Sequence, residues 1–252
     1  MGQKEKIAQH AYETVPYYRE LLKHNGLDIS NIDFEKQWAI LPLAHKKDVI
    51  TNSVSMISEE YLGRYAMEQL VKMHTSGTTG LCLDIYWDKM DYAKSLLPLW
   101  LQRWHKGGIR TKDKSCFFCT TIDQNKDYII HDNSIIFSEQ DLSEEKLIFM
   151  WNEILKYQPK WILGQPSVLT VLSNVVEKYN LSTCKSLRYI ELTGEMTLAG
   201  QETRFETIFG CPVKCHYGTM EVSTIGYEAN GLYKLFDSST YVEILDENGK
   251  TS

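Results

Sequence analysis

The sequence lacks the features that would place the protein in a membrane or on a nucleic acid. It has no uninterrupted run of about 18 apolar residues, and its N-terminus, MGQKEKIAQHAYE, has no apolar core like that of a signal peptide. Lysine and arginine total 27 against 33 aspartates and glutamates, so the formal net charge is -6 and there is no basic footprint. We expect a cytoplasmic protein without a membrane or nucleic-acid partner, whose ligand is a small acidic or neutral molecule.

Disulfide and zinc chemistry have little support. The six cysteines stand in a chain without an export signal, so we expect them to be reduced. Cys116 and Cys119 lie three apart in a segment of strand composition, which directs their side chains to opposite faces. Cys211, Cys215 and His216 are better metal candidates, but no second cysteine pair stands at zinc-site spacing. Packing is the main interpretation of these residues, and metal ligation the minor one.

The first part of the chain is predicted to be helical. Ile7 to Leu22 shows an amphipathic pattern that Pro16 interrupts, and Ser30 to Asp48 is rich in loop residues. A further helix is expected from Asp88 to His105, kinked at Pro98 and stopped by a glycine pair. Its apolar residues at helical spacing, expected to face a core, are Ala93, Leu96, Leu97, Trp100, Leu101 and Trp104.

Later segments alternate between strand and helix patterns. Strands are predicted at SCFFCTTI, KWILG, RYIELTG and VKCHYG, with helices at Ser143 to Tyr157, Pro166 to Tyr179 and Leu198 to Phe209. The second helix should bury Val168, Val171, Leu172, Val175 and Tyr179. This order predicts an α/β layered sheet that binds ligands beyond the carboxyl ends of its strands, where LTGE and HYGT fall. We expect a helical region over 1–70 and one continuous α/β portion over 71–252.

The end of the sequence resembles an unfinished hairpin. Tyr241 to Leu245 alternates as a strand does, and Glu247, Asn248 and Gly249 give a turn signal just before the last residues. This pattern predicts a fragment of a longer protein, or a naturally shortened copy of one.

A loop rich in glycine and hydroxyl groups, Thr75 to Leu81, is the main functional candidate. Gly77 and Gly80 accept backbone conformations closed to other residues, so successive amides can turn inward and form an anion nest. Small hydroxyl donors are supplied by Thr75, Ser76, Thr78 and Thr79. The Walker A pattern GxxxxGK[ST] does not fit this loop. Two interpretations stay open at this point, a polyphosphate cradle and an exposed hairpin turn.

Three motifs in order resemble those of the adenylate-forming superfamily, the acyl-CoA synthetases and their relatives. TSGTTG is similar to that family's phosphate loop, and LTGEM (192–196) and HYGTMEV (216–222, similar to YGxTE) follow in the family's order. The closest resemblance is to the phenylacetate-CoA ligase branch and its CapK-like members, which are linked to capsular polysaccharide biosynthesis. It extends over VPYYRELL, ILPLAHKKDVI, FSEQDLSEEKL, GQPSVLTVLS and VEILDENG. The resemblance implies the layered N-terminal domain of such an enzyme.

The resemblance also implies a reaction. ATP would activate a small carboxylic acid as an acyl adenylate, and coenzyme A would then take the acyl group as a thioester. Mg²⁺ would be bound by Glu221, and the implied catalytic residues are Thr79 and Glu221. The chain has no GxSxG or Ser-His-Asp arrangement, and adenylation needs none, because a carboxylate is already a nucleophile. The implied nucleotide-binding residues are Thr75, Ser76, Gly77, Thr78, Thr79, Gly80, Gly194, Glu195, Tyr217, Gly218 and Thr219.

Several of these residues have a purely structural alternative. Tyr217, expected against the adenine, would otherwise be a core tyrosine at a strand end. Glu195, expected to contact adenine through its backbone, would otherwise complement the dipole of the helix that follows it. Glu221 would otherwise be a solvated loop carboxylate. Gln165 to Ser167 would line the acyl pocket or simply start a helix, and His216 receives no catalytic role.

The sequence also departs from the family pattern. Leu81 and Cys82 stand where a Lys-Pro pair is usual, and Met220 replaces the threonine before the glutamate. TTIDQNKDYII does not match the acyl-pocket segment of phenylacetate ligases, so we expect a different acid. The RxTGD-like motif and the small domain with the catalytic lysine would lie beyond Ser252. We therefore expect this chain alone to be inactive and to self-associate; the alternative is a non-catalytic nucleotide-binding or interaction module.

Overall fold

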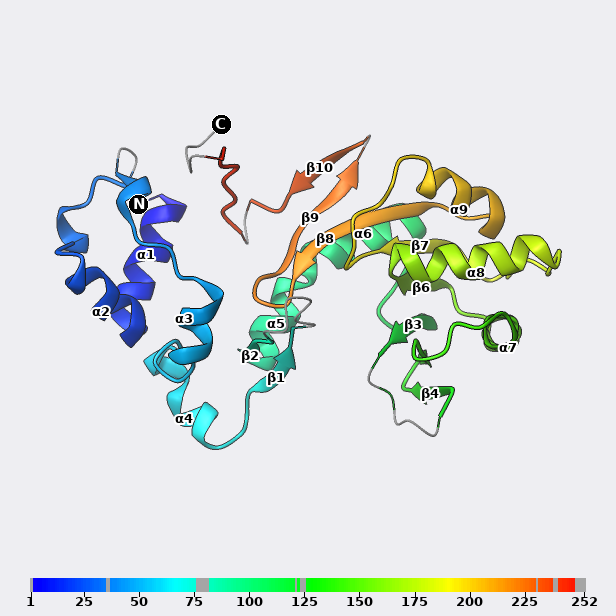
Figure 1. The fold of residues 1–252 in the computed structure, drawn as a ribbon, viewed down its shortest axis with the longest axis horizontal. Helices are drawn as coiled ribbons and strands as arrows, with labels where there is room; N and C mark the ends of the chain where they lie inside the picture. Colours follow the sequence, from blue (N-terminus) through cyan, green and yellow to red (C-terminus); the bar gives the residue numbers. More distant parts are fainter. Residues whose placement is uncertain are drawn as a thin grey trace. The chain divides into compact units, whose positions relative to one another are not determined.

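The computed structural model describes residues 2–34, 37–75, 82–120, 122, 126–229, 231–237 and 240–247. The chain folds as two compact units, one made of Met1–Lys94 with Tyr241–Ser252, the other of Ser95–Thr240 (Figure 1). The expected division into a helical region over 1–70 and an α/β portion over 71–252 stays a prediction. In the described ranges, no helix combines the length and the apolar character that a bilayer crossing requires.

The first unit is mainly helical, and the predicted break at Pro16 is confirmed. Pro16 takes the first position of its helix, where its missing N–H is not needed. Ala8, Leu22 and Ile29 form the small core of this unit. Its elements are α1 (Gln3–Thr14), α2 (Pro16–His24), η1 (Ile29–Asn31), η2 (Trp38–Ile40), α3 (Lys46–Thr51), η3 (Glu59–Tyr61), α4 (Leu62–Ala66), β1 (Val71–His74), β2 (Asp84–Trp87) and most of α5 (Lys89–Ser95).

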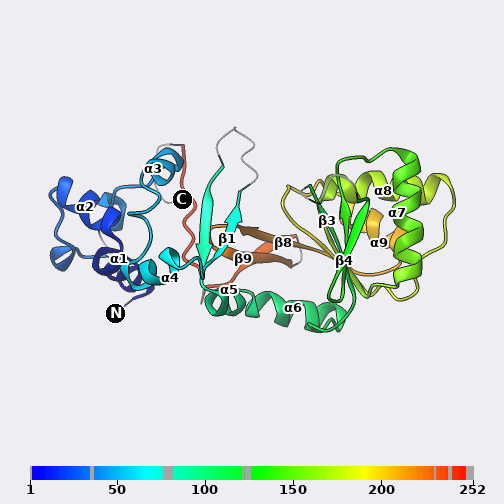
Figure 2. The ribbon, with the colours of Figure 1, turned by 90° about the horizontal axis from the view of Figure 1, so that it is seen from below.

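The glycine and hydroxyl loop joins the two strands of a hairpin, β1 and β2 (Figure 2). Their antiparallel register runs from Val71 opposite Trp87 to His74 opposite Asp84. These strands were not predicted, because four residues are too few for a two-residue period to be distinct. The choice between a phosphate cradle and an exposed turn depends on residues 76–81, which lie outside the described residues, so both interpretations stay predictions.

The segment Tyr241–Leu245 is not the strand that its alternation predicts. In the described part of the chain it forms only an isolated bridge at Leu245. Side chains hold it instead: Trp38 Nε1 donates to Glu243 Oε2 at 2.6 Å, and the Tyr241 ring packs edge-on against Trp38 at 5.7 Å. The prediction was wrong because alternating apolar and polar residues show only that one side of an extended segment is covered. Helices can cover that side as well as a neighbouring strand can.

Among its described residues, the second unit is built on an eight-stranded sheet in the order β10-β9-β8-β7-β6-β3-β5-β4. The five strands from β8 to β5 are parallel, and β4, β9 and β10 are antiparallel to their neighbours. The elements are α6 (Leu97–Gly107), β3 (Ser115–Cys119), β4 (Tyr128–His131), β5 (Ser134–Ser138), α7 (Glu144–Tyr157), β6 (Trp161–Gly164), α8 (Pro166–Lys178), β7 (Tyr189–Leu192), α9 (Gln201–Phe209), β8 (Val213–Thr219), β9 (Ser223–Ala229) and β10 (Leu232–Leu235). The predicted α/β layers are confirmed; β4, β5, β9 and β10 were missed.

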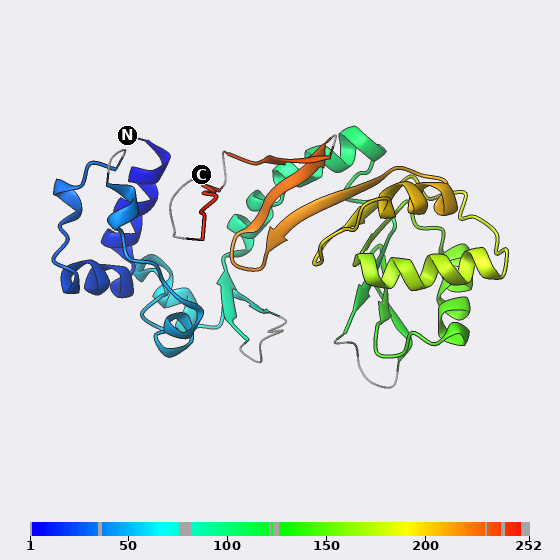
Figure 3. The same ribbon diagram turned by 45° about the horizontal axis from the view of Figure 1, so that its top comes forward.

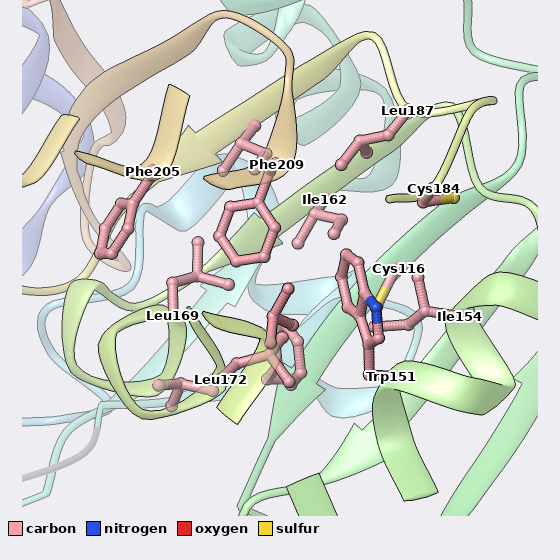
Figure 4. Packing of buried hydrophobic residues seen from close by; sticks show 14 of the residues in the cluster. Cys116, Trp151, Ile154, Ile162, Leu169, Leu172, Cys184, Leu187, Phe205 and Phe209 are labelled. Carbon is pink, nitrogen blue, oxygen red and sulfur yellow. The ribbon is translucent and has the colours of Figure 1, made fainter. Parts of the chain in front are cut away.

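The main core lies between one face of this sheet and helices α7, α8 and α9. Figures 1 and 3 show α8 beside α9, in agreement with their contacts. Figure 4 shows Trp151 and Phe209 meeting inside this core, with ring centroids 5.4 Å apart. On the opposite face, Trp161 and Tyr189 form a smaller cluster that includes Trp100 of α6. Both faces of the parallel strands are thus covered, as such strands require.

Two predicted helix faces were partly wrong. On α6, Leu97, Leu101 and Trp104 are 57%, 59% and 54% exposed, while Leu99 and Arg103 are buried. The buried face of α6 differs from the predicted one because Arg103 points inward to a buried acidic partner on the sheet. The spacing of apolar residues cannot reveal such a partner. On α8, the predicted apolar residues are buried or half-buried except Tyr179, which is exposed and donates its hydroxyl to Glu144 at 2.7 Å. The predicted break near Pro98 is confirmed, since α5 ends at Ser95 and this proline stands in the first turn of α6.

Candidate functional site

The carboxyl ends of β6, β7 and β8 bring two of the three motifs together. The turn after β7 is tied to β6, because Thr193 N donates to the carbonyl of Gly164 at 3.2 Å. A Cβ placed on Gly194 would lie 3.7 Å from Cγ of Gln165, the residue that follows β6. LTGEM therefore lies at the edge where ligands bind in α/β sheets.

Gly194 and Glu195 form an exposed turn whose side chain has a structural use. Gly194 has φ +83°, a left-handed conformation that favours glycine. The Glu195 carboxylate accepts hydrogen bonds from Ser167 N at 2.9 Å and Ser167 Oγ at 2.7 Å, in the first turn of α8. It therefore complements α8, and not the following helix, which starts only at Gln201. Both residues of this turn are exposed.

Tyr217 is not a core residue. It is 50% exposed near the end of β8, and its ring meets Tyr233 edge-on at 5.9 Å. The next residue, Gly218, has a structural reason to be glycine: a Cβ there would lie 2.1 Å from the carbonyl oxygen of Ser223. A half-exposed ring beside a close-packed glycine offers a flat surface on which a base can stack.

The third motif ends in a tight hairpin between β8 and β9. Thr219 pairs with Ser223, and the Thr219 hydroxyl accepts a hydrogen bond from Val222 N at 3.4 Å. Glu221 stands exposed in the three-residue loop. In the ranges that the structure describes, no group of three or more His, Cys, Asp or Glu residues could hold a metal. A lone carboxylate fits Mg²⁺ that takes its other ligands from phosphates and water.

Only the first residue of the predicted phosphate loop is described. The Thr75 hydroxyl accepts a hydrogen bond from Leu83 N at 2.9 Å, which closes the base of the hairpin. His74 Nδ1 lies 2.6 Å from Asp84 Oδ1, and Lys72 Nζ lies 2.9 Å from Asp84 Oδ2. The Lys72 ammonium holds the pKa of the Asp84 carboxyl below its usual range. The other predicted loop residues lie outside the described residues: Ser76, Gly77, Thr78, Thr79 and Gly80, with Leu81 after them.

The candidate metal ligands do not converge on one point. Cys215 Sγ donates to Glu202 Oε1 at 3.1 Å and lies 3.0 Å from Thr197 Oγ1. Burial raises the pKa of this thiol to about 12. His216, the next residue of the strand, projects to the opposite face of the sheet. The side chains of Cys215 and His216 therefore lie on opposite faces of the sheet and cannot bind the same metal ion.

A buried ion pair below this edge was missed by the sequence analysis. Arg103 Nε and Nη2 donate to Glu191 Oε2 and Oε1 at 2.9 and 2.6 Å. The guanidinium carbon lies 4.6 Å from the ring centroids of both Trp100 and Trp161. His216 Nδ1 lies 3.9 Å from Glu191 Oε1, and burial lowers the pKa of this imidazole. The signal available in the sequence was Glu191, a charged residue between the apolar residues Ile190 and Leu192 of a predicted strand.

Glu139 is a second group that the sequence analysis missed. It follows β5, at the same edge of the sheet, and forms a hydrogen bond with the Gln165 side chain. Its Oε1 is buried without a hydrogen-bond partner in the part of the chain that the structure describes. Burial raises the pKa of this carboxyl, and the charge of Glu195 adds to the effect.

Comparison with known proteins identifies the fold. No family model matches the sequence. No curated protein matches it. Among solved structures, 2-hydroxyisobutyryl-CoA ligase with 2-HIB-AMP and CoA in its thioesterification state aligns with 98% of this chain and 55% of its own, at TM-score 0.73 and 18% identity. The same ligase in an open conformation aligns with 97% and 60%, at TM-score 0.71 and 16% identity. The chain shares the fold of this CoA ligase.

A further ligase is similar over a smaller region. An anthranilate CoA ligase in complex with anthranoyl-AMP aligns with 73% of this chain and 37% of its own, at TM-score 0.51 and 17% identity. The chain thus spans 55% to 60% of the length of the 2-hydroxyisobutyryl-CoA ligase structures. The predicted fold class, an α/β layered sheet with helices, is confirmed by its match to the fold of these ligase structures.

Proposed function

We propose that this chain is the nucleotide-binding portion of an adenylate-forming acid–CoA ligase. The observation that supports this most is the common position of the Thr193–Glu195 turn and the Tyr217–Glu221 segment at one edge of a sheet with the CoA-ligase fold. A backbone turn and an exposed ring at one edge suit a flat heterocycle with a phosphate tail.

The reaction proceeds in two displacements. A carboxylate oxygen of the acid attacks the α-phosphorus of ATP, the bond to the β-phosphate oxygen breaks, and pyrophosphate leaves with the electron pair. The thiolate of coenzyme A then attacks the acyl carbon, and AMP leaves. Negative charge spreads over the phosphoryl oxygens in the first transition state, so fixed donors and a cation at these oxygens lower the barrier.

The residues divide this work between them. Tyr217 stacks on the adenine, and the exposed backbone of Gly194 and Glu195 borders it. The loop Thr75 to Gly80 holds the β- and γ-phosphates, with Thr79 among its donors. Glu221 would hold Mg²⁺, which would supply positive charge at the phosphates. Gly218 and Thr219 keep the β8 end in the shape that presents these groups.

The finer assignment rests on sequence resemblance. We place the chain in the CapK-like branch of the phenylacetate-CoA ligases, with a role in capsular polysaccharide biosynthesis and an acid other than phenylacetate. The nucleotide-binding portion would extend over 71–252, after a helical region over 1–70. A second candidate is a non-catalytic nucleotide-binding module, which the lack of a loop lysine at Leu81 and the replacement at Met220 favour.

Calorimetric titration of the chain with AMP and with Mg·ATP tests the proposal. Tyr217→Ala should weaken both titrations, while Glu221→Gln should weaken only the Mg²⁺-dependent part, with circular dichroism to check folding. Absence of binding by the folded parent chain would contradict the proposal. Because we expect this chain alone to be inactive, the two candidates separate in the full gene product, supplied with ATP, a panel of acids and coenzyme A: release of pyrophosphate favours the ligase, and its absence favours the module.

A further inference from the structure

His216 stands where the backbone pairing between β7 and β8 ends. The last register pair of these strands is Leu192 opposite Cys215. The residues that follow these two are linked through their side chains, because Thr193 Oγ1 lies 3.4 Å from His216 Nδ1. One side-chain contact thus joins the turn that leads to Gly194 with the strand that leads to Tyr217.

The buried Glu191 carboxylate lies next to the ring of His216 and helps to orient it. Its Nδ1 lies 3.9 Å from Glu191 Oε1. That carboxylate is fixed on both oxygens by Arg103, whose side chain is 7% exposed. Two tryptophan rings in turn enclose the guanidinium. The imidazole therefore sits on a support with little freedom to move.

The other edge of the ring packs against the second motif. A Cβ on Gly218 would lie 2.9 Å from His216 Nε2 and 3.1 Å from Cε1, so the ring fills the space beside this glycine. Nε2 has no hydrogen-bond partner in the part of the chain that the structure describes. The polar anchoring of the ring therefore depends on Nδ1.

We propose that His216 is a positioning residue of the nucleotide site, which holds the Thr193 turn and the Gly218 strand end in register through Nδ1 and its ring face. This inference rests on the proposed function, since it concerns the site assigned there to AMP and ATP. His216 does not touch the nucleotide and acts through its two neighbours. The buried pair of Arg103 and Glu191 keeps the ring in the orientation that this role requires.

Two amide replacements separate this role from general packing. Asparagine at 216 can place a polar atom close to the position of Nδ1, whereas glutamine places one near Nε2. We measure AMP affinity by calorimetry, and thermal midpoints by circular dichroism, for His216→Asn, His216→Gln and His216→Leu. We expect His216→Asn to bind within about threefold of the parent chain, and the other two to bind on the order of tenfold more weakly, the effect of about one hydrogen bond.

A second pair of variants covers the case in which replacements at the buried ring prevent folding. Thr193→Val removes only the hydroxyl that meets Nδ1, and it should also weaken AMP binding on the order of tenfold. The matched control is Thr197→Val, which removes a hydroxyl that contacts Cys215 on the other face of the same strand and should leave the affinity unchanged.

The outcomes are distinct. Equal affinities for the asparagine and glutamine variants at equal thermal midpoints would overturn the inference, as would unchanged affinity in Thr193→Val. If the folded parent chain binds no AMP, the proposed function fails and this inference with it. Affinity that follows the Nδ1 contact in both His216 and Thr193 variants, with normal binding by Thr197→Val, supports the positioning role.

Discussion

The guanidinium of Arg103 donates hydrogen bonds to both carboxylate oxygens of Glu191. Both side chains are buried, with only 7% and 1% of their surface exposed. The pair joins α6 to β7 across 88 residues of sequence. Two charges that are buried together depend on each other, because removal of one leaves the other without a partner and without water.

Substitution of either member should therefore cost much of the stability of the second unit. We expect Glu191→Gln and Arg103→Met each to lower the free energy of unfolding by about 3–5 kcal/mol. Urea denaturation followed by tryptophan fluorescence measures this. The double variant Arg103→Met, Glu191→Met should lose clearly less than the sum of the single losses, since no charge is then stranded. Additive losses would contradict the coupling.

The pH dependence of stability should carry a signature of His216. Burial lowers the pKa of this imidazole below its ordinary value of 6.5, against the partial compensation from Glu191, while Arg103 adds to the lowering. Below pH 6.5 the unfolded chain therefore binds a proton that the folded chain resists, so stability is lost as the pH falls from 6.5 toward the folded pKa.

His216→Asn removes this titration. The fall in unfolding free energy between neutral and mildly acidic pH should be smaller in the variant than in the parent chain. His131→Asn, on the exposed end of β4, is the control and should leave the fall unchanged. Identical pH profiles for the parent chain and His216→Asn would show that the ring is not held neutral.

Two glycines should respond differently to alanine. Gly218→Ala would force a Cβ within 2.1 Å of the Ser223 carbonyl, which requires the hairpin to open. We expect a loss of about 2–3 kcal/mol with impaired AMP binding. Gly200→Ala meets no atom within 4 Å and carries only the strain of φ +84°, so it should cost about 1–2 kcal/mol and leave AMP binding intact. Thermal unfolding and calorimetry distinguish them.

The sequence predicted the layers of this fold better than its connections. Strands β3, β6, β7 and β8 were recognisable, because a short apolar run between two helix patterns is typical of a buried strand. The partner of Glu195 was not, since Ser167 lies 28 residues away and neither residue type is specific to such a pair. The inward face of α6 was also missed, because a charged residue such as Arg103 counts as surface until its partner is known.

The indole of Trp38 offers a test of the first unit. Its Nε1 donates to Glu243 at 2.6 Å, and Lys4 lies 5.4 Å from its ring centroid. Glu243→Gln keeps an acceptor and should destabilise this unit by less than about 1 kcal/mol. Glu243→Ala strands the half-buried donor and should cost about 1–3 kcal/mol. Glu247→Ala is the control, as this residue is exposed. Thermal unfolding followed by circular dichroism gives the midpoint of each variant. Equal thermal midpoints for Glu243→Gln, Glu243→Ala and Glu247→Ala would mean that the hydrogen bond contributes nothing to stability.

The same contact orders events during synthesis. Trp38 and Glu243 are separated by 205 positions, and everything between the two parts of the first unit must leave the ribosome before they can meet. Since domains of nascent chains fold as they emerge, the eight-stranded sheet is available to fold while the helical unit still waits for its last segment. Of the two units, the one whose translation begins first is therefore the one that is completed last.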